Sequence, residues 1–189
     1  MKFLFFPALF DNPTKISFAE QEADETLVLF LRQHPIVNVP WIVYSLLALV
    51  LPVLFIQIDL SFGLGFFSNI PDSLFIAALI IYYVLILGYV VEQFLHWYFN
   101  IYIVTNKHLV DVDFDSLLYR HITEVNLEDV ESVKSKLMGV FASLFNYGDV
   151  KVETAAAHQA IDFIKVPKPD FVADKIQDLV GEAKKEDNP

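Results

Sequence analysis

The sequence predicts an α+β membrane protein, in which a two-helix transmembrane hairpin is followed by a bent antiparallel β-sheet and a C-terminal α-helix. Two windows without any charged residue, 41–58 and 74–91, indicate the hairpin. Alternating apolar and polar residues after position 97 indicate the sheet. The composition agrees, because 55% of the 189 residues are hydrophobic, which is more than an ordinary soluble domain needs.

The two uncharged windows have the length of membrane-spanning helices. Trp41–Ile58 and Leu74–Val91 each hold 18 residues, which make about 27 Å of helix and just span a bilayer. A buried helix pair in a soluble core is the alternative, but so short a chain has little else to cover two segments that are apolar all round. Pro52 should kink the first helix without preventing it from spanning. We expect residues 36–96 to form this hairpin.

Aromatic and basic residues border the hairpin. Trp and Tyr favour membrane–water interfaces, which predicts interface anchors at Trp41, Tyr44, Trp97 and Tyr98. Basic residues precede the first helix and follow the second, whereas the connection 59–73 has none. The positive-inside rule then predicts that both termini face the cytoplasm. The expected localisation is therefore a membrane, with a multi-pass topology.

Residues 1–35 are expected to form an interfacial and juxtamembrane segment. The opening "MKFLFFPALF" is broken by Pro7 and has no small-residue cleavage site after it. It is expected to be retained as an interfacial anchor, with a disordered tail as the alternative. The following residues are interpreted as an acidic helix start with an apolar stripe at Leu27, Phe30 and Leu31, which Pro35 ends.

Close to Trp97 the backbone is expected to change from helix to sheet. Glu92, Gln93 and His96 end the lipid-compatible run, and β-branched and aromatic residues follow. Asn106 and Lys107 then suit a two-residue hairpin turn. The next strand alternates, with one face formed by His108, Val110, Val112 and Phe114 and the other largely by Leu109, Asp111, Asp113 and Asp115.

The rest of the expected cytoplasmic domain, 97–183, contains further strands and a closing helix. Strands are predicted at 119–127, 129–137, 148–156 and 159–166. Segment 137–148 is ambiguous, and we interpret it as a turn or short helix packed on the sheet. The closing helix should have Asp170 as its N-cap and a polar tail at 184–189. Its apolar face is expected to hold Phe171, Val172, Ile176, Leu179 and Val180.

The order of these elements resembles that of the bacterial pleckstrin-homology-like (PH-like) membrane proteins. The resemblance runs from Arg32 to Val180 and rests on an ordered series of short motifs: "RQHPI", "IVTNKHLV", "VNLEDVESVKSK", "GDVKV" and "IDFIKVPKP". It implies a location in the bacterial inner membrane and a cytoplasmic half-barrel capped by the terminal helix, with no established catalytic residues to carry over. The stretch "FASLFNYGDV" departs from the usual pattern, being longer and more aromatic than the expected Gly-rich turn.

The residues give no support for enzyme chemistry. The chain has no cysteine, its five histidines are scattered, and it has no GxSxG or phosphate-binding Gly-rich loop. Asp111, Asp113 and Asp115 resemble the beginning of a calcium loop, but the central Gly is missing and Ile122 stands where the bidentate Glu belongs. A solvated strand face is the preferred interpretation. For Glu92 and His96, a headgroup-level anchor is preferred to a proton-handling pair. We expect no catalytic residue, cofactor or metal.

The charge balance bears on the partners. The net charge of −11 works against nucleic acid, which requires a surplus of Lys and Arg. From Trp97 onward, 10 Lys and Arg stand against 16 Asp and Glu, a balance of −6 that repels anionic lipid. The first hairpin offers only Lys107 and His108 to a headgroup. A local cluster of basic residues would favour lipid, and the candidates are Lys134, Lys136, Lys151 and Lys165.

Besides the bilayer itself, the expected partner is another protein or a second copy of the chain. Phe141, Phe145 and Tyr147 are the candidate anchors, with core packing as the alternative. The sequence thus predicts a non-catalytic scaffold or adaptor at the cytoplasmic face of the membrane. The alternative is a membrane protein that senses lipid headgroups.

Overall fold

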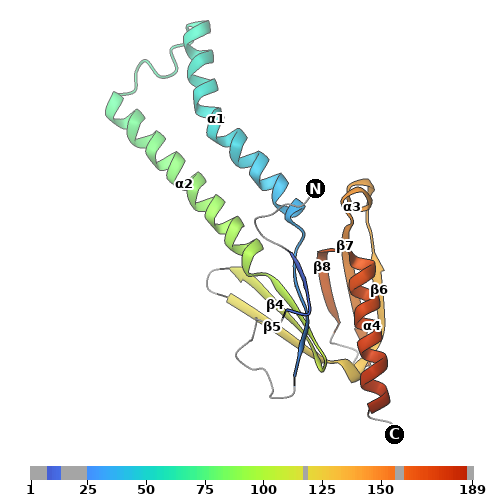
Figure 1. Ribbon diagram of the computed structural model, residues 1–189. Coiled ribbons are helices and arrows are strands. Elements are labelled where there is room, and N and C mark those ends of the chain that lie inside the picture. The colour runs from blue at the N-terminus through green and yellow to red at the C-terminus, as the bar shows by residue number, and fades with distance from the viewer. Residues whose placement is uncertain (1–7, 14–24, 117–118, 156–159, 187–189) are drawn as a thin grey trace. The chain divides into compact units, whose positions relative to one another are not determined.

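The computed structural model describes residues 8–13, 25–116, 119–155 and 160–186 (Figure 1). The helices are η1 (Pro35–Asn38), α1 (Val39–Phe62), α2 (Asp72–Phe99), η2 (Leu127–Asp129), α3 (Val140–Phe145) and α4 (Pro169–Glu186). The strands are β1 (Leu9–Asp11), β2 (Leu27–Arg32), β3 (Ile101–Thr105), β4 (His108–Ser116), β5 (Tyr119–Asn126), β6 (Val130–Lys136), β7 (Tyr147–Thr154) and β8 (Ile161–Pro167). The chain divides into a helix unit, residues 38–95, and a sheet unit, residues 1–37 and 96–189.

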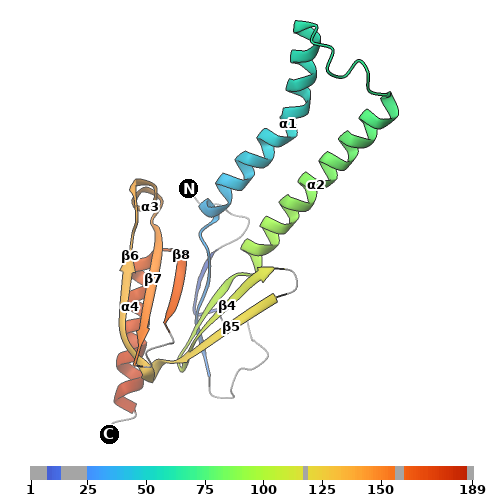
Figure 2. The same ribbon diagram turned by 180° about the vertical axis from the view of Figure 1, so that it is seen from behind.

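The sheet unit contains two antiparallel sheets (Figures 1 and 2). One has five strands in the order β1-β2-β3-β4-β5, and the other has three in the order β6-β7-β8. Strands β2 and β3 are neighbours, with Arg32 opposite Ile101, although the whole helix unit lies between them in the sequence. The sheet unit is therefore assembled from both sides of the helix unit.

The interpretation of the residues around 27–31 as a juxtamembrane helix was wrong. They form β2, and the side chains of Leu29 and Leu31 are fully buried. The apolar run "LVLFL" continues without polar interruptions because both faces of this strand are covered: Leu29 and Leu31 belong to the main core, while Leu27 and Phe30 belong to a second cluster. A strand buried on both faces has no alternation to distinguish it from a short apolar helix. Of the first ten residues, expected as an interfacial anchor, residues 1–7 lie outside the described residues. Leu9 and Phe10 do not form a separate anchor, because they belong to β1 and pair with β2.

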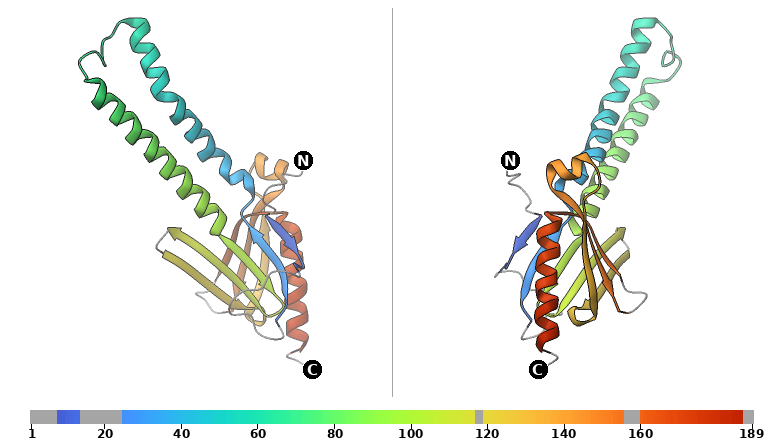
Figure 3. Two further views of the ribbon diagram at one scale, coloured as in Figure 1. Left: turned by 60° about the vertical axis from the view of Figure 1, so that its left-hand side comes forward. Right: turned by 90° about the vertical axis from the view of Figure 1, so that its right-hand side faces the viewer.

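The main core lies between the two sheets and α4. Tyr102 of β3 and Phe163 of β8 meet there, with ring centroids 4.8 Å apart. The backbone N–H of Ile164 donates to the Tyr102 hydroxyl at 3.2 Å, and burial raises the pKa of that hydroxyl to about 12. Because α4 contributes Val172, Ile176 and Val180 to the same core, it closes the space against β6 and β7 (Figure 3).

The predicted closing helix is confirmed, with two corrections. Phe171 points away from the core and is exposed. Asp170 lies in the first turn, after Pro169, and it is not the N-cap. Its carboxylate accepts a hydrogen bond from the Ser135 hydroxyl at 2.6 Å, so the residue ties α4 to β6. The reason for the first error is that an apolar residue within the first turn need not share the face that the later turns bury.

The predicted strands of the sheet unit are also confirmed, and so is the turn at Asn106 and Lys107 between β3 and β4. The change from helix to sheet comes later than expected, because α2 continues to Phe99 and β3 begins at Ile101. Trp97 extends the helix because its ring is buried and its Nε1–H donates to the Gln33 carbonyl at 3.0 Å. Tertiary contacts here override the sheet propensity of the aromatic residues.

The helix unit consists of α1, of α2 as far as Leu95, and of their connection. Both helices are long and apolar enough to cross a membrane by length and composition. Pro52 lies inside α1, where a proline cannot donate to the carbonyl four residues earlier. That carbonyl, of Ala48, accepts a hydrogen bond from the Tyr82 hydroxyl of α2 at 2.8 Å. A proline in one helix is thus compensated by a tyrosine of the other.

We expect Tyr82→Phe to lower the stability of the helix unit by about 1 kcal/mol, because the Ala48 carbonyl loses its donor. Thermal unfolding of the purified protein would measure the loss. Tyr89→Phe is the matched control, since the Tyr89 hydroxyl has no hydrogen bond within the described residues. Equal melting temperatures for the two variants would contradict the role of Tyr82.

Candidate functional site

The most distinctive surface of the sheet unit is the tip of the β6–β7 hairpin, which carries α3 (Figure 1). Gly139 precedes the helix with a φ of 95°, a conformation that favours glycine. Asn146 ends it in the left-handed conformation, and its N–H donates to the Ala142 carbonyl. The ambiguous segment 137–148 therefore contains a short helix, one of the two expected structures.

The side chains of this helix are not packed on the sheet as expected. Within α3 only Ala142 is buried. Val140, Phe141 and Leu144 are 82%, 70% and 72% exposed. We define the α3 patch as the exposed apolar residues of this tip, which are Leu137, Met138, Val140, Phe141, Leu144 and Phe145. Core packing, the alternative considered for Phe141 and Phe145, does not describe their environment.

Tyr147, the third candidate anchor, has a different position. Its ring stacks on that of His34, with centroids 5.4 Å apart and planes 22° apart. His34 is held in place, because its backbone N–H donates to the Lys165 carbonyl at 2.7 Å and its ring Nδ1 accepts a hydrogen bond from the backbone N–H of Ile36 at 3.1 Å. Burial lowers the pKa of His34, which agrees with a neutral ring whose Nδ1 is an acceptor. Tyr147 thus joins the base of the α3 hairpin to the segment that leads into α1.

The base of the hairpin is closely packed around Gly148. A Cβ added there would lie 2.5 Å from the Lys136 carbonyl oxygen and 3.1 Å from Cγ of Pro169. The Lys168 N–H also donates to the Asn146 carbonyl at 2.8 Å. The tip is therefore held by β6, by the start of α4 and by His34.

We expect Gly148→Ala to lower the free energy of unfolding of the sheet unit by about 1–3 kcal/mol, because the backbone of β6 must move to admit the methyl group. Gly181→Ala is the control: no atom lies within 4 Å of its Cβ position, and alanine should stabilise α4 by roughly 0.5–1 kcal/mol. Chemical denaturation would measure both. An unchanged free energy of unfolding in Gly148→Ala would show that the backbone of β6 can move to admit the methyl group at little cost.

Three of the four candidate basic residues share a surface with as many acidic residues. Lys134, Lys136 and Lys151 share the outer face of the three-stranded sheet with Asp149, Glu153 and Asp162, three charges of each sign. Lys134 Nζ lies 2.8 Å from Glu153 Oε2, and this hydrogen bond lowers the pKa of the carboxyl. The arrangement gives no net attraction for an anionic headgroup on this face.

The first hairpin is occupied by contacts within the protein. His108 Nδ1 lies 3.1 Å from Oε1 of Glu25, a buried carboxylate. The Thr105 hydroxyl donates to the same oxygen at 2.6 Å, and the Thr26 N–H donates to Asn106 Oδ1 at 2.7 Å. His108 therefore serves to hold the residues before β2 against the β3–β4 turn.

The aspartates of β4 are less solvated than expected. Burial, together with the neighbouring charges of Asp113 and Asp162, raises the pKa of Asp111 to about 7. Its Oδ1 is buried and has no hydrogen-bond partner within the described part of the chain. The interpretation as a solvated strand face was thus wrong for Asp111, because this position faces the space between the sheets. No group of three or more His, Cys, Asp or Glu in the described residues is arranged to hold a metal.

The four predicted interface anchors lie in unlike environments. In the helix unit, Tyr44 is 66% exposed, and Trp41 donates its Nε1–H to Asn38 Oδ1 at 3.0 Å. In the sheet unit, Trp97 is buried, and the Arg32 guanidinium lies 4.2 Å from the centre of the Tyr98 ring. Their role as membrane-interface anchors stays a prediction.

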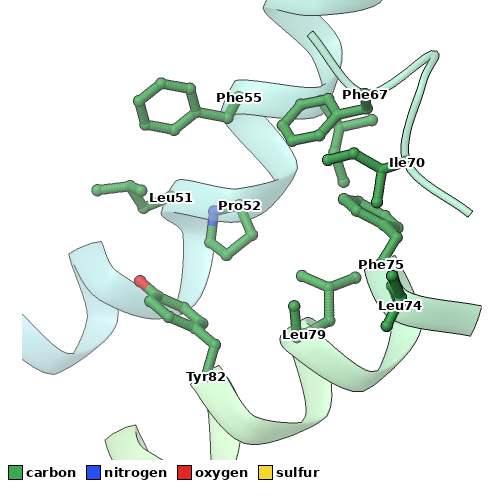
Figure 4. Close-up of a pocket in the computed structure, with 11 residues that line it drawn as sticks. Leu51, Pro52, Phe55, Phe67, Ile70, Leu74, Phe75, Leu79 and Tyr82 are labelled. Atoms are coloured by element: carbon green, nitrogen blue, oxygen red, sulfur yellow. The ribbon is translucent and has the colours of Figure 1, made fainter.

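The helix unit also contains an apolar cavity of about 340 Å³ (Figure 4). Leu51, Pro52 and Phe55 of α1 face Leu79 and Tyr82 of α2 across it (Figure 4). Phe67 and Ile70 of the connection close one side. The Tyr82 hydroxyl is already committed to Ala48, so the cavity offers van der Waals contacts and little directional polar binding.

Sequence reasoning missed Glu25, Gln33 and His34. Each acts through a partner far along the chain: His108, Trp97 and Tyr147 respectively. The only available signal was that polar residues flank the apolar run of β2 on both sides. Polar groups in such positions can form hydrogen bonds with residues of neighbouring segments.

Two antiparallel sheets with a closing C-terminal helix form an α+β unit of the PH-like class, whose members suggest an interaction or lipid-binding module. Residues 36–180 match the family described as "Bacterial PH domain", and the chain belongs to this family. No curated protein matched the chain. A solved structure of a DUF1696 family protein with a pleckstrin-homology domain, from Shewanella loihica PV-4, is 15% identical, covers 44% of this chain and 68% of that one, and has a TM-score of 0.33.

Proposed function

We propose that this protein is an integral protein of the bacterial inner membrane, whose sheet unit is a non-catalytic scaffold or adaptor at the cytoplasmic face. The exposure of the helix unit supports the membrane location. In the most apolar windows of the two helices, only 6% and 0% of the residues are buried. A helix of a soluble protein buries its apolar side chains against a core, so these surfaces require lipid or another cover.

The pairing of β2 with β3 supports a topology in which both ends of the proposed hairpin are on the same side of the bilayer. Arg32 precedes the helix unit, Ile101 follows it, and the two lie opposite each other in one sheet. Both ends of the spanning hairpin must therefore be on the same side of the bilayer. The basic residues before and after the hairpin favour the cytoplasm as that side.

The surface of the sheet unit favours a protein partner over headgroup sensing. Positive and negative charges balance on the outer face of the three-stranded sheet, and His108 of the first hairpin is engaged with Glu25. The outer edge of β5 pairs with no other described strand. An extended segment of a partner can add to such an edge through main-chain hydrogen bonds.

Thiol labelling in cells tests the membrane location, because the chain has no cysteine of its own. Asn69→Cys places a thiol in the α1–α2 connection, and Glu128→Cys places one in η2. A membrane-impermeant maleimide should label position 69 from the outer side, and position 128 only after the inner membrane is permeabilised. Labelling of both before permeabilisation, or extraction of the protein by alkaline carbonate, would overturn the membrane proposal.

Photo-crosslinking tests the scaffold role. A photoreactive amino acid at Ile122, an exposed residue of β5, should give a defined protein adduct in native membranes. The same group at Glu182 in α4 is the control, since that side chain is exposed but lies away from the strand edge. Lipid adducts in place of protein adducts at position 122 would favour headgroup sensing.

A further inference from the structure

We propose that the α3 patch is a third membrane contact, which inserts into the interfacial layer of the bilayer beside the spanning hairpin. This inference rests on the proposed function, because it requires α1 and α2 to span that bilayer. It assigns lipid as the partner of Phe141 and Phe145, whose partner the sequence left open between another protein and a second copy.

The chemistry of the tip is that of an interfacial anchor. No charged residue occurs between 137 and 148, and all six residues of the α3 patch expose large apolar side chains. Aromatic and aliphatic residues on one short element favour the boundary between headgroups and acyl chains. Left in water, a contiguous apolar surface of this kind promotes association.

The position of the tip within the sheet unit supports this proposal. Tyr147 follows α3 directly and stacks on His34. Only η1, Pro35–Asn38, separates His34 from the first residue of α1, a span of at most about 18 Å even when fully extended. The distance from Tyr147 to the start of the first spanning helix is thus limited by the chain itself, whatever the arrangement of the two units.

The second connection lies at the same end of the sheet unit. Trp97, in the last turns of α2, donates to the Gln33 carbonyl, next to His34. Within the sheet unit, α3 lies at the end of the β6–β7 hairpin, and α4 runs from that end toward the C-terminus (Figure 3). Both chain crossings and the apolar tip therefore belong to one end of this unit.

The tip is held firmly enough to carry its side chains to a defined depth. Gly148 packs against the Lys136 carbonyl, and the Lys168 N–H binds the Asn146 carbonyl. Lys136 and Lys168 are exposed at the base of the tip, where long basic side chains can reach headgroups while their stems remain apolar. Asp149 is opposite Lys136 in the sheet, so apolar insertion, rather than net charge, supplies the attraction.

The same surface on a soluble module would call for a protein partner or a second copy. Here the short connection to α1 limits how far the patch can lie from the proposed bilayer, which raises the effective concentration of lipid relative to that of a partner in solution. For that reason we assign the bilayer as the occupant.

The test uses the full-length protein in vesicles of phosphatidylethanolamine and phosphatidylglycerol. Single variants Phe141→Cys, Leu85→Cys and Glu128→Cys are labelled with a nitrobenzoxadiazole fluorophore, whose emission shifts to shorter wavelength in apolar surroundings. Leu85 is an exposed residue of α2, and Glu128 lies in η2. Lipids that carry a nitroxide either near the headgroup or near the chain end then report depth by quenching. Circular dichroism verifies that each labelled variant is folded, and Leu144→Cys is a second probe of the patch.

We expect a blue shift and strong quenching by the shallow nitroxide at positions 141 and 144, quenching by the deep nitroxide at position 85, and neither effect at position 128. Quenching at position 85 without quenching at 141 and 144 overturns the α3 inference and leaves the membrane proposal intact. Absence of quenching at all positions overturns both. A blue shift at 141 that grows with the protein-to-lipid ratio and resists nitroxide identifies a second copy as the occupant, and also overturns the inference.

Discussion

A fragment comprising only residues 97–189 is expected to remain unfolded. It lacks β2, whose Leu29 and Leu31 are fully buried in the main core, and it leaves β3 with an unpaired edge. Truncating one buried leucine typically costs about 2–5 kcal/mol, whereas a whole domain is stable by about 5–15 kcal/mol. Loss of both residues together with the strand hydrogen bonds should exceed the stability of the unit. Amide proton dispersion in a nuclear magnetic resonance spectrum would reveal the result.

The matched control joins residues 25–37 to residues 96–189 through a flexible Gly/Ser linker in place of the helix unit. Such a linker has a short distance to cover, because Arg32 and Ile101 are paired neighbours. This chain should fold cooperatively, and Leu31→Ala within it should lower the midpoint of urea denaturation. A dispersed spectrum from the 97–189 fragment alone would refute the structural role of β2.

Stability of the sheet unit is expected to fall as the pH rises from about 4 to about 7, owing to Asp111. Its pKa is raised from 3.8 to about 7 in the folded protein, so the folded state binds a proton that the unfolded state has already released in this range. The proton on Asp111 therefore favours the folded state fully below about pH 4. This contribution to stability is lost progressively as the pH rises through the pKa of the folded state, about 7. The shift corresponds to at most about 4 kcal/mol, and solvent screening of a partly buried group reduces this by roughly half.

Asp111→Asn should remove most of this slope, since the amide cannot ionise, and should stabilise the protein at pH 8 relative to the native chain. Urea denaturation at pH 5 and pH 8 would measure both effects. Asp174→Asn, at an exposed position of α4, is the control for a general change in net charge. An unchanged slope in Asp111→Asn would mean that other groups cause the pH dependence.

Much of the fold could be predicted because its elements carry strong local patterns. The alternation in β4 and β7, the Asn106–Lys107 turn and the apolar face of α4 each follow from the residues nearby. β2 could not be recognised, because its neighbour β3 lies beyond the helix unit and the burial of both faces removes the alternation. When two paired strands are so far apart in the sequence, no pattern in the residues around either strand indicates the pairing.

The candidate site was found in part. Phe141 and Phe145 were singled out as aromatic residues in an ambiguous segment, but their exposure depends on the glycine and asparagine that set α3 apart from the sheet. Tyr147 belongs to the same stretch and yet packs on His34. Nothing in the sequence separates its environment from theirs, because the difference arises from the path of the chain before α1. The raised pKa of Asp111 likewise depends on a second sheet that local patterning does not place opposite it.

The pairing of Arg32 with Ile101 also has a consequence for biosynthesis. β2 leaves the ribosome before the helix unit and must wait until β3 has been made, so the five-stranded sheet cannot form during early synthesis. If the helix unit spans a membrane as proposed, insertion of only one of the two apolar helices would leave β2 and β3 on opposite sides of that membrane, where they could not pair. Completion of the sheet would then act as a proofreading step, in which only chains with a correctly threaded hairpin gain a folded domain and escape proteolysis.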